Sequence, residues 1–298
     1  MGTTDMREQL KTWFYTTRPH TLSASLAPML VVLGALIAEG TFRLIPYLLC
    51  VTVAFFAQIS SNLANDYFDF IGGKDTDERV GFERVLTTGR VSQKEIMILL
   101  GVALAITSIA GFALAATEGW ELLIIGVFVL IGALAYSSGP FPLSHNALGD
   151  FAVVLLFGLI PMLASYYAIA GRPPLYLLFF ALTIGVWEVN ILVCNNYRDY
   201  KEDKKSGKKT IVVRMGGASG PILYLINSLI TLGCLVIGLL LLGKWIWAIV
   251  LFLLAGSAYM VGTLAIRKAK GKQLNKLLVY TSKLTLYTGI ALFLALIL

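Results

Sequence analysis

Long apolar stretches separated by short polar segments follow one another along almost the whole chain. Most approach the ~20 residues that a helix needs to cross the hydrocarbon core of a bilayer. The stretch over residues 122–136 is shorter and needs flanking residues to do so. The nine stretches are Leu22–Ala38, Leu44–Ser61, Ile96–Ala116, Leu122–Tyr136, Phe151–Ala170, Leu175–Cys194, Ile222–Leu242, Trp245–Ile266 and Leu277–Leu298. The pattern predicts an all-α polytopic membrane protein with nine spans in one domain, residues 1–298; eight or ten spans remain compatible with it.

The composition supports a membrane protein. Apolar residues make up 57% of the chain and Asp, Glu, Lys and Arg only 14%, whereas soluble proteins carry about 25% charged residues. A bilayer accommodates such a chain because lipid-facing positions can stay apolar.

The basic residues predict the orientation. Twenty of the 24 Lys and Arg lie in alternate segments between the stretches, beginning with the N-terminal segment. Positive segments stay in the cytoplasm, so we expect a cell-membrane protein with a cytoplasmic N-terminus and an external C-terminus. Residues 1–21 are expected to form an interfacial segment on the inner leaflet. The net charge of +7 is explained by topology and by attraction to anionic lipid, without nucleic acid.

Aspartates are the main sign of chemistry. Six of the eight lie in the two longest inside loops, residues 62–95 and 195–219: Asp66, Asp69, Asp75, Asp77, Asp199 and Asp203. If the preceding helices continue into these loops, Asn62, Asp66 and Asp69 share one helix face, and so do Asn195, Asp199 and Asp203. The repeated Asn-x-x-x-Asp indicates two half-repeats that face each other. Asp75 and Asp77 are less certain ligands, because Gly72 and Gly73 interrupt the helical register.

This arrangement predicts a metal site built from oxygen ligands. Carboxylates stacked on a helix face repel one another and need a cation, and hard oxygen ligands select Mg²⁺, with Mn²⁺ as a substitute. Mg²⁺ usually shares its ligand shell with substrate phosphate, and the neighbouring cations suit a diphosphate: Lys74, Arg79, Arg84, Arg198, Lys204, Lys208 and Lys209. With two histidines and no Cys/His cluster, a zinc or haem site is not expected.

Four stretches resemble the UbiA superfamily of intramembrane prenyltransferases, and in particular its 1,4-dihydroxy-2-naphthoate polyprenyltransferases. They are the opening Arg18-Pro19-His20-Thr21-Leu22, the first motif from Asn62 to Asp69, the loop Tyr136-Ser137-Ser138-Gly139-Pro140, and the second motif from Asn195 to Asp203. Two departures are that Ser137-Ser138 replaces Thr-Gly, and that Gly73 stands four residues after Asp69, where a third aspartate is expected.

The resemblance implies nine helices around a lipid-open cavity and Mg²⁺-dependent transfer of a polyprenyl group. The implied partners are membrane lipid, polyprenyl diphosphate and 1,4-dihydroxy-2-naphthoate, and the products are demethylmenaquinol, CO₂ and diphosphate. Asp66, Asp69, Asp199 and Asp203 are the expected metal ligands and catalytic residues. The expected substrate-binding residues are Asn62, Asn65, Lys74, Asp75, Arg79, Asn195, Arg198 and Lys204 near the diphosphate, with Arg18, Tyr136 and His145 near the acceptor.

Other functions remain open from the sequence. Another acceptor, such as 4-hydroxybenzoate, homogentisate or a glycerol-phosphate lipid, would use the same metal motifs. A cation-coupled transporter would more often place its carboxylates near mid-membrane, and a phosphotransferase would show a His or Ser nucleophile within the cluster. Glu188 and Asn190 lie within the sixth stretch, where a polar side chain faces protein or a cavity by default.

Overall fold

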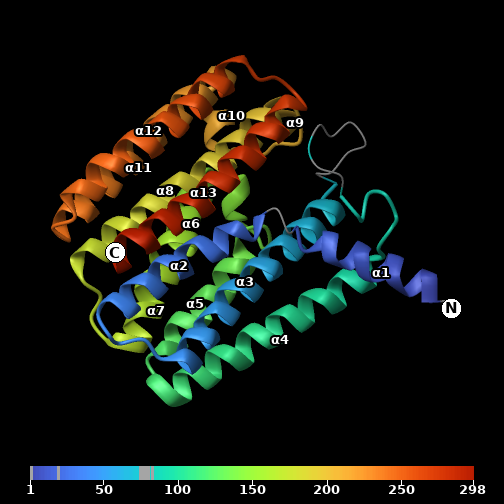
Figure 1. Ribbon diagram of the computed structural model, residues 1–298. Helices are drawn as coiled ribbons and strands as arrows, with labels where there is room; N and C mark the ends of the chain where they lie inside the picture. The colour runs from blue at the N-terminus through green and yellow to red at the C-terminus, as the bar shows by residue number, and fades with distance from the viewer. Residues whose placement is uncertain (1–2, 19–20, 74–80, 82–83) are drawn as a thin grey trace.

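The computed structural model describes residues 3–18, 21–73, 81 and 84–298. Within them every regular element is helical (Figure 1). The elements are α1 (Thr3–Thr16), α2 (Ser23–Ala38), α3 (Leu44–Ile71), α4 (Gln93–Glu118), α5 (Leu122–Ala135), η2 (Leu143–His145), α6 (Gly149–Val153), η3 (Val154–Leu159), α7 (Ile160–Ala170), α8 (Leu175–Arg198), α9 (Tyr200–Lys205), α10 (Ile211–Met215), η4 (Gly217–Ser219), α11 (Gly220–Leu241), α12 (Trp245–Lys268) and α13 (Gln273–Ile297). The all-α prediction is confirmed.

All nine apolar stretches are helical, but they differ in length. In the described part of the chain, seven helices are long and apolar enough to cross a membrane. The other two, Ala24–Ala38 and Leu122–Ala135, are shorter. Seven of the nine predicted spans therefore have the length and composition of a membrane-spanning helix. The two short helices need their flanking residues to reach both faces of a bilayer.

Large apolar side chains cover the outside of the bundle. Ile109 on α4 is 69% exposed and Ile124 on α5 is 75% exposed, and α12 exposes a similar row of residues. In water such a surface would be an interaction or aggregation liability. In lipid it is the expected outer surface, so these helices form an integral membrane protein.

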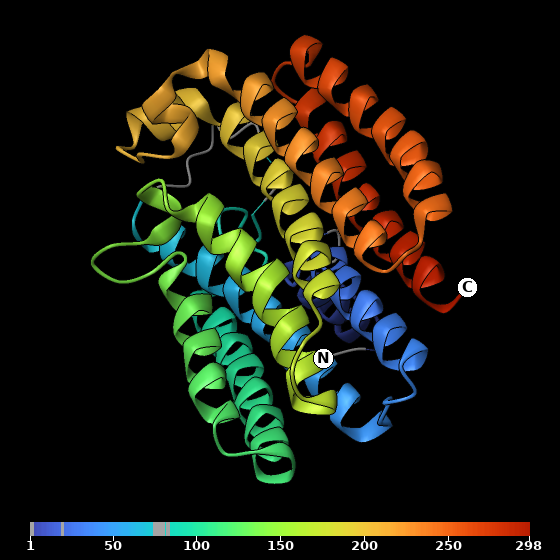
Figure 2. The same cartoon turned by 90° about the vertical axis from the view of Figure 1, so that its left-hand side faces the viewer.

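The two Asp-motif helices occupy corresponding positions. α3 packs along α4, the next long helix, and α8 packs in the same way along α11, while α2 joins the halves by packing on α13. The C-terminal ends of α3 and α8 point to the same end of the bundle, where α9, α10 and the segment after α5 gather (Figures 1 and 2). This arrangement brings the two polar loops together.

A close helix crossing fixes α8 against the segment before α7. A Cβ atom on Gly158 would lie 2.4 Å from the Ala181 carbonyl oxygen, and one on Gly185 would lie 3.0 Å from the Gly158 Cα. Here η3 has π-helical hydrogen bonding. Pro161 explains the wider turn, because proline has no N–H to donate to the carbonyl four residues earlier and its ring clashes with that carbonyl.

Polar contacts hold the opposite end of the bundle together. Glu39, after α2, accepts hydrogen bonds from the Tyr166 hydroxyl and, at 2.5 Å, from the Tyr176 hydroxyl. Arg43 lies 2.5 Å from Glu118 at the end of α4. These contacts join the α2–α3, α4–α5 and α7–α8 connections at the end of the bundle away from the Asp motifs.

Candidate active site

The first Asp motif lies on a continuous helix, as its spacing predicted. α3 extends through Asp69 to Ile71, and Asn62, Asp66 and Asp69 are all buried. The Asn62 side chain donates to the Thr17 carbonyl at 3.1 Å and to the Thr21 hydroxyl at 3.0 Å. Asn62 thus anchors the segment between α1 and α2 to the motif.

Asp66 is 3% exposed and is neutralised by two arginines. It accepts hydrogen bonds from Arg18 and from Arg84, which is itself buried. Arg18 also lies 3.2 Å from the Asn65 amide oxygen, and the Asn65 amide nitrogen donates to Ser137 at 2.8 Å. The segments expected near the acceptor and the diphosphate therefore meet at one carboxylate.

Asp69 is 1% exposed and gathers three partners of basic type. Its carboxylate lies 3.2 Å from Arg84 Nη2, 3.2 Å from Lys208 Nζ and 3.1 Å from His145 Nε2. Lys208 comes from the segment after the second motif, so this ion cluster joins the two polar loops directly.

The second motif differs from the predicted single helix. α8 ends at Arg198 and α9 begins at Tyr200, and Asp199 between them has φ −92° and ψ 8°. Arg198 donates to both oxygens of Asp199 at 2.6 Å. Adjacent residues of a regular helix do not face each other, so this pairing accompanies a departure from helical geometry at Asp199.

Arg198 is the centre of the second motif. It is 8% exposed and donates to Asn195 at 2.6 Å and to Asn275 at the start of α13 at 2.7 Å. A planar guanidinium that holds a carboxylate bidentately is a fixed and strong anion contact. Arg198 therefore orients Asp199 and Asn195 and ties them to a third helix.

Both motifs line one polar cavity. Eleven of the sequence-predicted site residues surround it: Arg18, Asn62, Asn65, Asp66, Asp69, Tyr136, His145, Asn195, Arg198, Asp199 and Asp203. Lys74, Asp75 and Arg79 lie outside the described residues. The expected facing of the two motifs is thus found in the structure.

The basic residues were less well predicted. Lys204 is exposed and does not line the cavity, because it follows the cavity-lining Asp203 by one residue and points about 100° away from it around α9. Arg84 and Lys208 line the cavity but stood in the sequence only among several nearby cations. Glu188, buried within α8, also lines the cavity.

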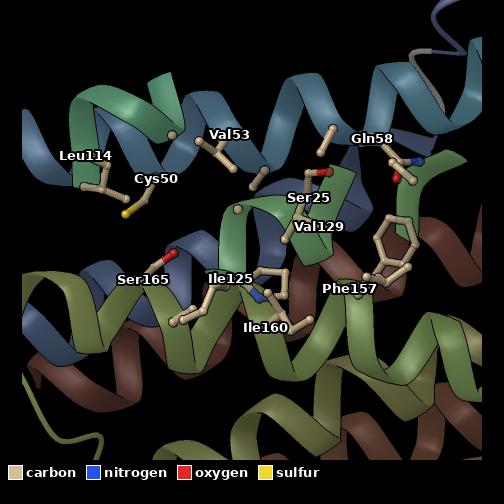
Figure 3. A pocket seen from close by; sticks show the side chains of 18 of the residues that line it. Ser25, Cys50, Val53, Gln58, Leu114, Ile125, Val129, Phe157, Ile160 and Ser165 are labelled. Atoms are coloured by element: carbon tan, nitrogen blue, oxygen red, sulfur yellow. The ribbon is translucent and has the colours of Figure 1, made fainter. Parts of the chain in front are cut away.

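An apolar cavity adjoins the polar one (Figure 3). Its walls carry Val53 of α3, Leu114 of α4, Ile125 of α5 and Ile160 of α7. The two cavities have Gln58, Ser61 and Phe157 in common. A ligand with an anionic head and a hydrocarbon tail could therefore occupy both.

The donor atoms fit Mg²⁺ held together with a phosphate ligand. Four aspartates and four asparagines supply hard oxygen donors around the polar cavity. Among the residues that the structure describes, no group of three His, Cys, Asp or Glu side chains could hold a metal ion. A metal in this cavity would take further ligands from water and substrate, as Mg²⁺ usually does.

Proteins of one known family resemble this chain in sequence. The model of the UbiA prenyltransferase family matches residues 25–296. The 1,4-dihydroxy-2-naphthoate octaprenyltransferase of Haemophilus influenzae is 31% identical, over 74% of this chain and 74% of that protein. The Escherichia coli protein of the same name is 33% identical, over 68% of each chain.

Solved structures share the fold at low sequence identity. The apo structure of a UbiA homolog from Aeropyrum pernix K1 has a TM-score of 0.71 and 17% identity, covering 92% of this chain and 96% of that one. A UbiA homolog from Archaeoglobus fulgidus bound to DMAPP and Mg²⁺ has a TM-score of 0.65 and 18% identity, covering 93% and 97%. The chain belongs to the UbiA prenyltransferase family and is a membrane-embedded prenyltransferase.

Proposed function

We propose that this prenyltransferase transfers a polyprenyl group from polyprenyl diphosphate to 1,4-dihydroxy-2-naphthoate in a Mg²⁺-dependent reaction. The products are demethylmenaquinol, diphosphate and CO₂. The observation that carries the proposal is that both Asp motifs line the same polar cavity, which adjoins an apolar cavity. The octaprenyltransferases at about 30% identity favour the naphthoate acceptor.

The cavity residues form two groups: acidic and amide side chains that would hold Mg²⁺, and cationic side chains that would hold the diphosphate. Asp66, Asp69, Asp199 and Asp203 would hold Mg²⁺, with Asn62, Asn65 and Asn195 as further oxygen donors. Bound Mg²⁺ would neutralise charge on the diphosphate oxygens as the leaving group departs. The cationic groups already gathered in the cavity, Arg18, Arg84, Arg198 and Lys208, would hold phosphate oxygens.

The chemistry balances without a redox partner. The C–O bond of the allylic diphosphate breaks and the diphosphate leaves with its electron pair. The ring carbon that bears the carboxylate forms the new C–C bond to the prenyl carbon. The ring carboxylate leaves as CO₂ and its bonding electrons return to the ring. The apolar walls keep water from capturing the electron-poor prenyl carbon.

Tyr136 and His145 belong to the acceptor side of the cavity in this proposal. Both follow α5, and His145 contacts Asp69 through Nε2. The backbone N–H of Lys209 donates to the His145 carbonyl at 2.7 Å. This bond holds the segment after α5 beside the segment after the second motif, so acceptor and donor regions are positioned together.

The decisive experiment gives the purified protein Mg²⁺, a polyprenyl diphosphate and a panel of acceptors. The panel contains 1,4-dihydroxy-2-naphthoate, 4-hydroxybenzoate, homogentisate and a glycerol-phosphate lipid. We expect prenylation and CO₂ release with the naphthoate. If only a different compound of the panel is prenylated, the protein is a prenyltransferase whose acceptor is that compound and not the naphthoate.

A further inference from the structure

Glu188 is a buried acid that the diphosphate chemistry leaves unused. It is 3% exposed, lies on α8 and lines the polar cavity. Within the described residues, its Oε1 atom has no hydrogen-bond partner. A buried carboxyl oxygen without a partner is unfavourable, so a ligand that provides a hydrogen-bond partner would stabilise it.

The helix geometry places Glu188 between the diphosphate region and the apolar cavity. Glu188 precedes Asn195 by seven residues, two helical turns on the same face, or about 10 Å along the axis. In the other direction it follows Gly185 by one turn, about 4.5 Å. Gly185 is the point where α8 crosses Gly158, next to Phe157, which lines both cavities.

This junction is where the reacting carbon of a prenyl diphosphate must lie. That carbon connects the anionic head to the hydrocarbon chain, so it sits where polar walls give way to apolar ones. The attacking ring carbon has to approach it to about 3–3.5 Å. A side chain at the junction is therefore within reach of the acceptor ring rather than of the diphosphate oxygens.

The chemistry of Glu188 selects the group that it binds. A carboxyl group keeps an oxygen that accepts a hydrogen bond whether or not it is protonated, and a hydroxyl group is a matching donor. The pairs of arginine and lysine with acids in this cavity involve Asp66 and Asp69 on α3 and Asp199 at the end of α8, and Asp199 follows Glu188 by 11 residues, about three helical turns. The acceptor proposed above carries two ring hydroxyls.

We propose that Glu188 accepts a hydrogen bond from a ring hydroxyl of the aromatic acceptor and thereby selects and orients phenolic rings. The inference rests on the proposed function, because it requires a hydroxylated aromatic acceptor. A buried site built to bind a hydroxyl discriminates strongly against an analogue that lacks it, since its polar group is then left unpaired.

The test crosses enzyme variants with acceptor variants. Glu188→Leu removes the carboxyl group, and Glu188→Gln keeps its size and one carbonyl oxygen. Glu121→Gln is the matched control, because it makes the same change from acid to amide at the start of α5, the end away from the cavity-lining Tyr136. Initial rates are measured with 1,4-dihydroxy-2-naphthoate and with each of its two monomethyl ethers at saturating polyprenyl diphosphate, and with varied polyprenyl diphosphate at saturating naphthoate.

We expect Glu188→Leu to lower kcat/KM for the naphthoate by about 10- to 100-fold, the scale of one lost buried hydrogen bond. KM for polyprenyl diphosphate should stay within about 2-fold of wild type, because only acceptor binding is changed. For the wild-type enzyme, one monomethyl ether should be a poorer substrate than the naphthoate. For Glu188→Leu, the same ether and the naphthoate should be equally good substrates. The Gln variant should lie between the two.

The outcomes separate the two proposals. The wild-type enzyme could transfer the prenyl group to the naphthoate while the effect of Glu188→Leu simply adds to the effect of each methyl ether. That result would overturn the role of Glu188 and leave the proposed function intact. So would an equal rise in the KM for polyprenyl diphosphate. Wild-type transfer to no hydroxylated aromatic compound would overturn the proposed function and this inference with it. If Glu188→Leu does not fold, the isosteric Glu188→Gln variant carries the same comparison.

Discussion

The ammonium nitrogen of Lys208 lies 3.2 Å from Oδ2 of Asp69, although 139 residues separate them in the sequence. The same Asp69 contacts His145, whose carbonyl accepts from the N–H of Lys209. The end of the first Asp motif is thus bound on both sides to the segment that follows the second. This connection leads us to expect that the motifs act as one unit.

Asp66→Ala and Asp199→Ala should each lower single-turnover prenyl transfer by more than about 10²-fold, the scale of one lost preorganised electrostatic contact. The double variant should lose little more than either single variant, as for residues that function together. The measurement uses purified variants of matched thermal stability, with Glu121→Gln as the control. Near-wild-type turnover of Asp199→Ala, or full additivity, would argue against a shared diphosphate.

Metal removal should stop the reaction. The cavity offers oxygen donors from aspartates and asparagines, which suit Mg²⁺ or Mn²⁺ rather than zinc. We expect EDTA to abolish prenyl transfer, added Mg²⁺ to restore it, and a zinc-selective chelator to have no effect. Activity that survives EDTA would contradict the assignment of the aspartates as metal ligands.

Arg84→Ala should lower stability and donor binding together. Arg84 is buried and contacts both Asp66 and Asp69, and removal of one partner of a buried ion pair costs about 3–5 kcal/mol. Because Arg18 and Lys208 also contact these acids, we expect a loss at or below the lower end of that range. Arg90→Ala, an exposed change in the same loop, is the control.

Mg²⁺ distinguishes an electrostatic effect of Arg84→Ala from simple unfolding. A ligand that binds only the folded state raises the melting temperature. The variant leaves more uncompensated negative charge, so Mg²⁺ should raise its Tm more than that of wild type. An equal rise in both proteins would show that Arg84 does not compete with the metal for these carboxylates.

Gly158→Ala should destabilise the bundle by about 1–3 kcal/mol, the usual cost of overpacking. The new methyl group would lie 2.4 Å from a backbone oxygen of α8, which cannot rotate away as a side chain can. Gly233→Ala is the matched control, because its Cβ would meet nothing within 4 Å. Equal melting temperatures of the two variants would mean that the crossing adjusts without strain.

The orientation in the membrane is tested with terminal tags. Since the basic residues cluster on the side of the N-terminus, a tag after Leu298 should be accessible from outside intact cells and one before Met1 only after lysis. A C-terminal tag that is protected until lysis would contradict the nine-span arrangement.

The helices were predictable because they follow from local periodicity, and the meeting of the motifs was predictable from the Asn-x-x-x-Asp that recurs at two helix ends. The spacing of Asn62, Asp66 and Asp69 required only that α3 continue, and it does. The interruption at Asp199 was not predictable in this way, because it accompanies a pairing between the adjacent Arg198 and Asp199.

The choice among the basic residues also depends on tertiary structure. Gly207, with φ +77°, turns the chain after α9, and the N–H of Lys208 then donates to the Asp203 carbonyl at 2.9 Å. This turn directs Lys208 rather than Lys204 towards Asp69. Charge and spacing along the chain do not distinguish these two lysines. The local sign of the turn in the sequence is Gly207 between them, since glycine readily adopts a positive φ.

The arginine partners of Asp66 have a thermodynamic consequence for ligand entry. Mg²⁺ alone has to compete with Arg18 and Arg84 for the carboxylate, and diphosphate alone has to detach them from it. If both bind as proposed, the cation would pair with the Asp66 carboxylate and the freed guanidinium groups with the diphosphate, so each ligand would lower the cost of binding the other. Binding of the two would then be reciprocally cooperative, so the site would bind Mg²⁺ and diphosphate together more tightly than their separate affinities predict.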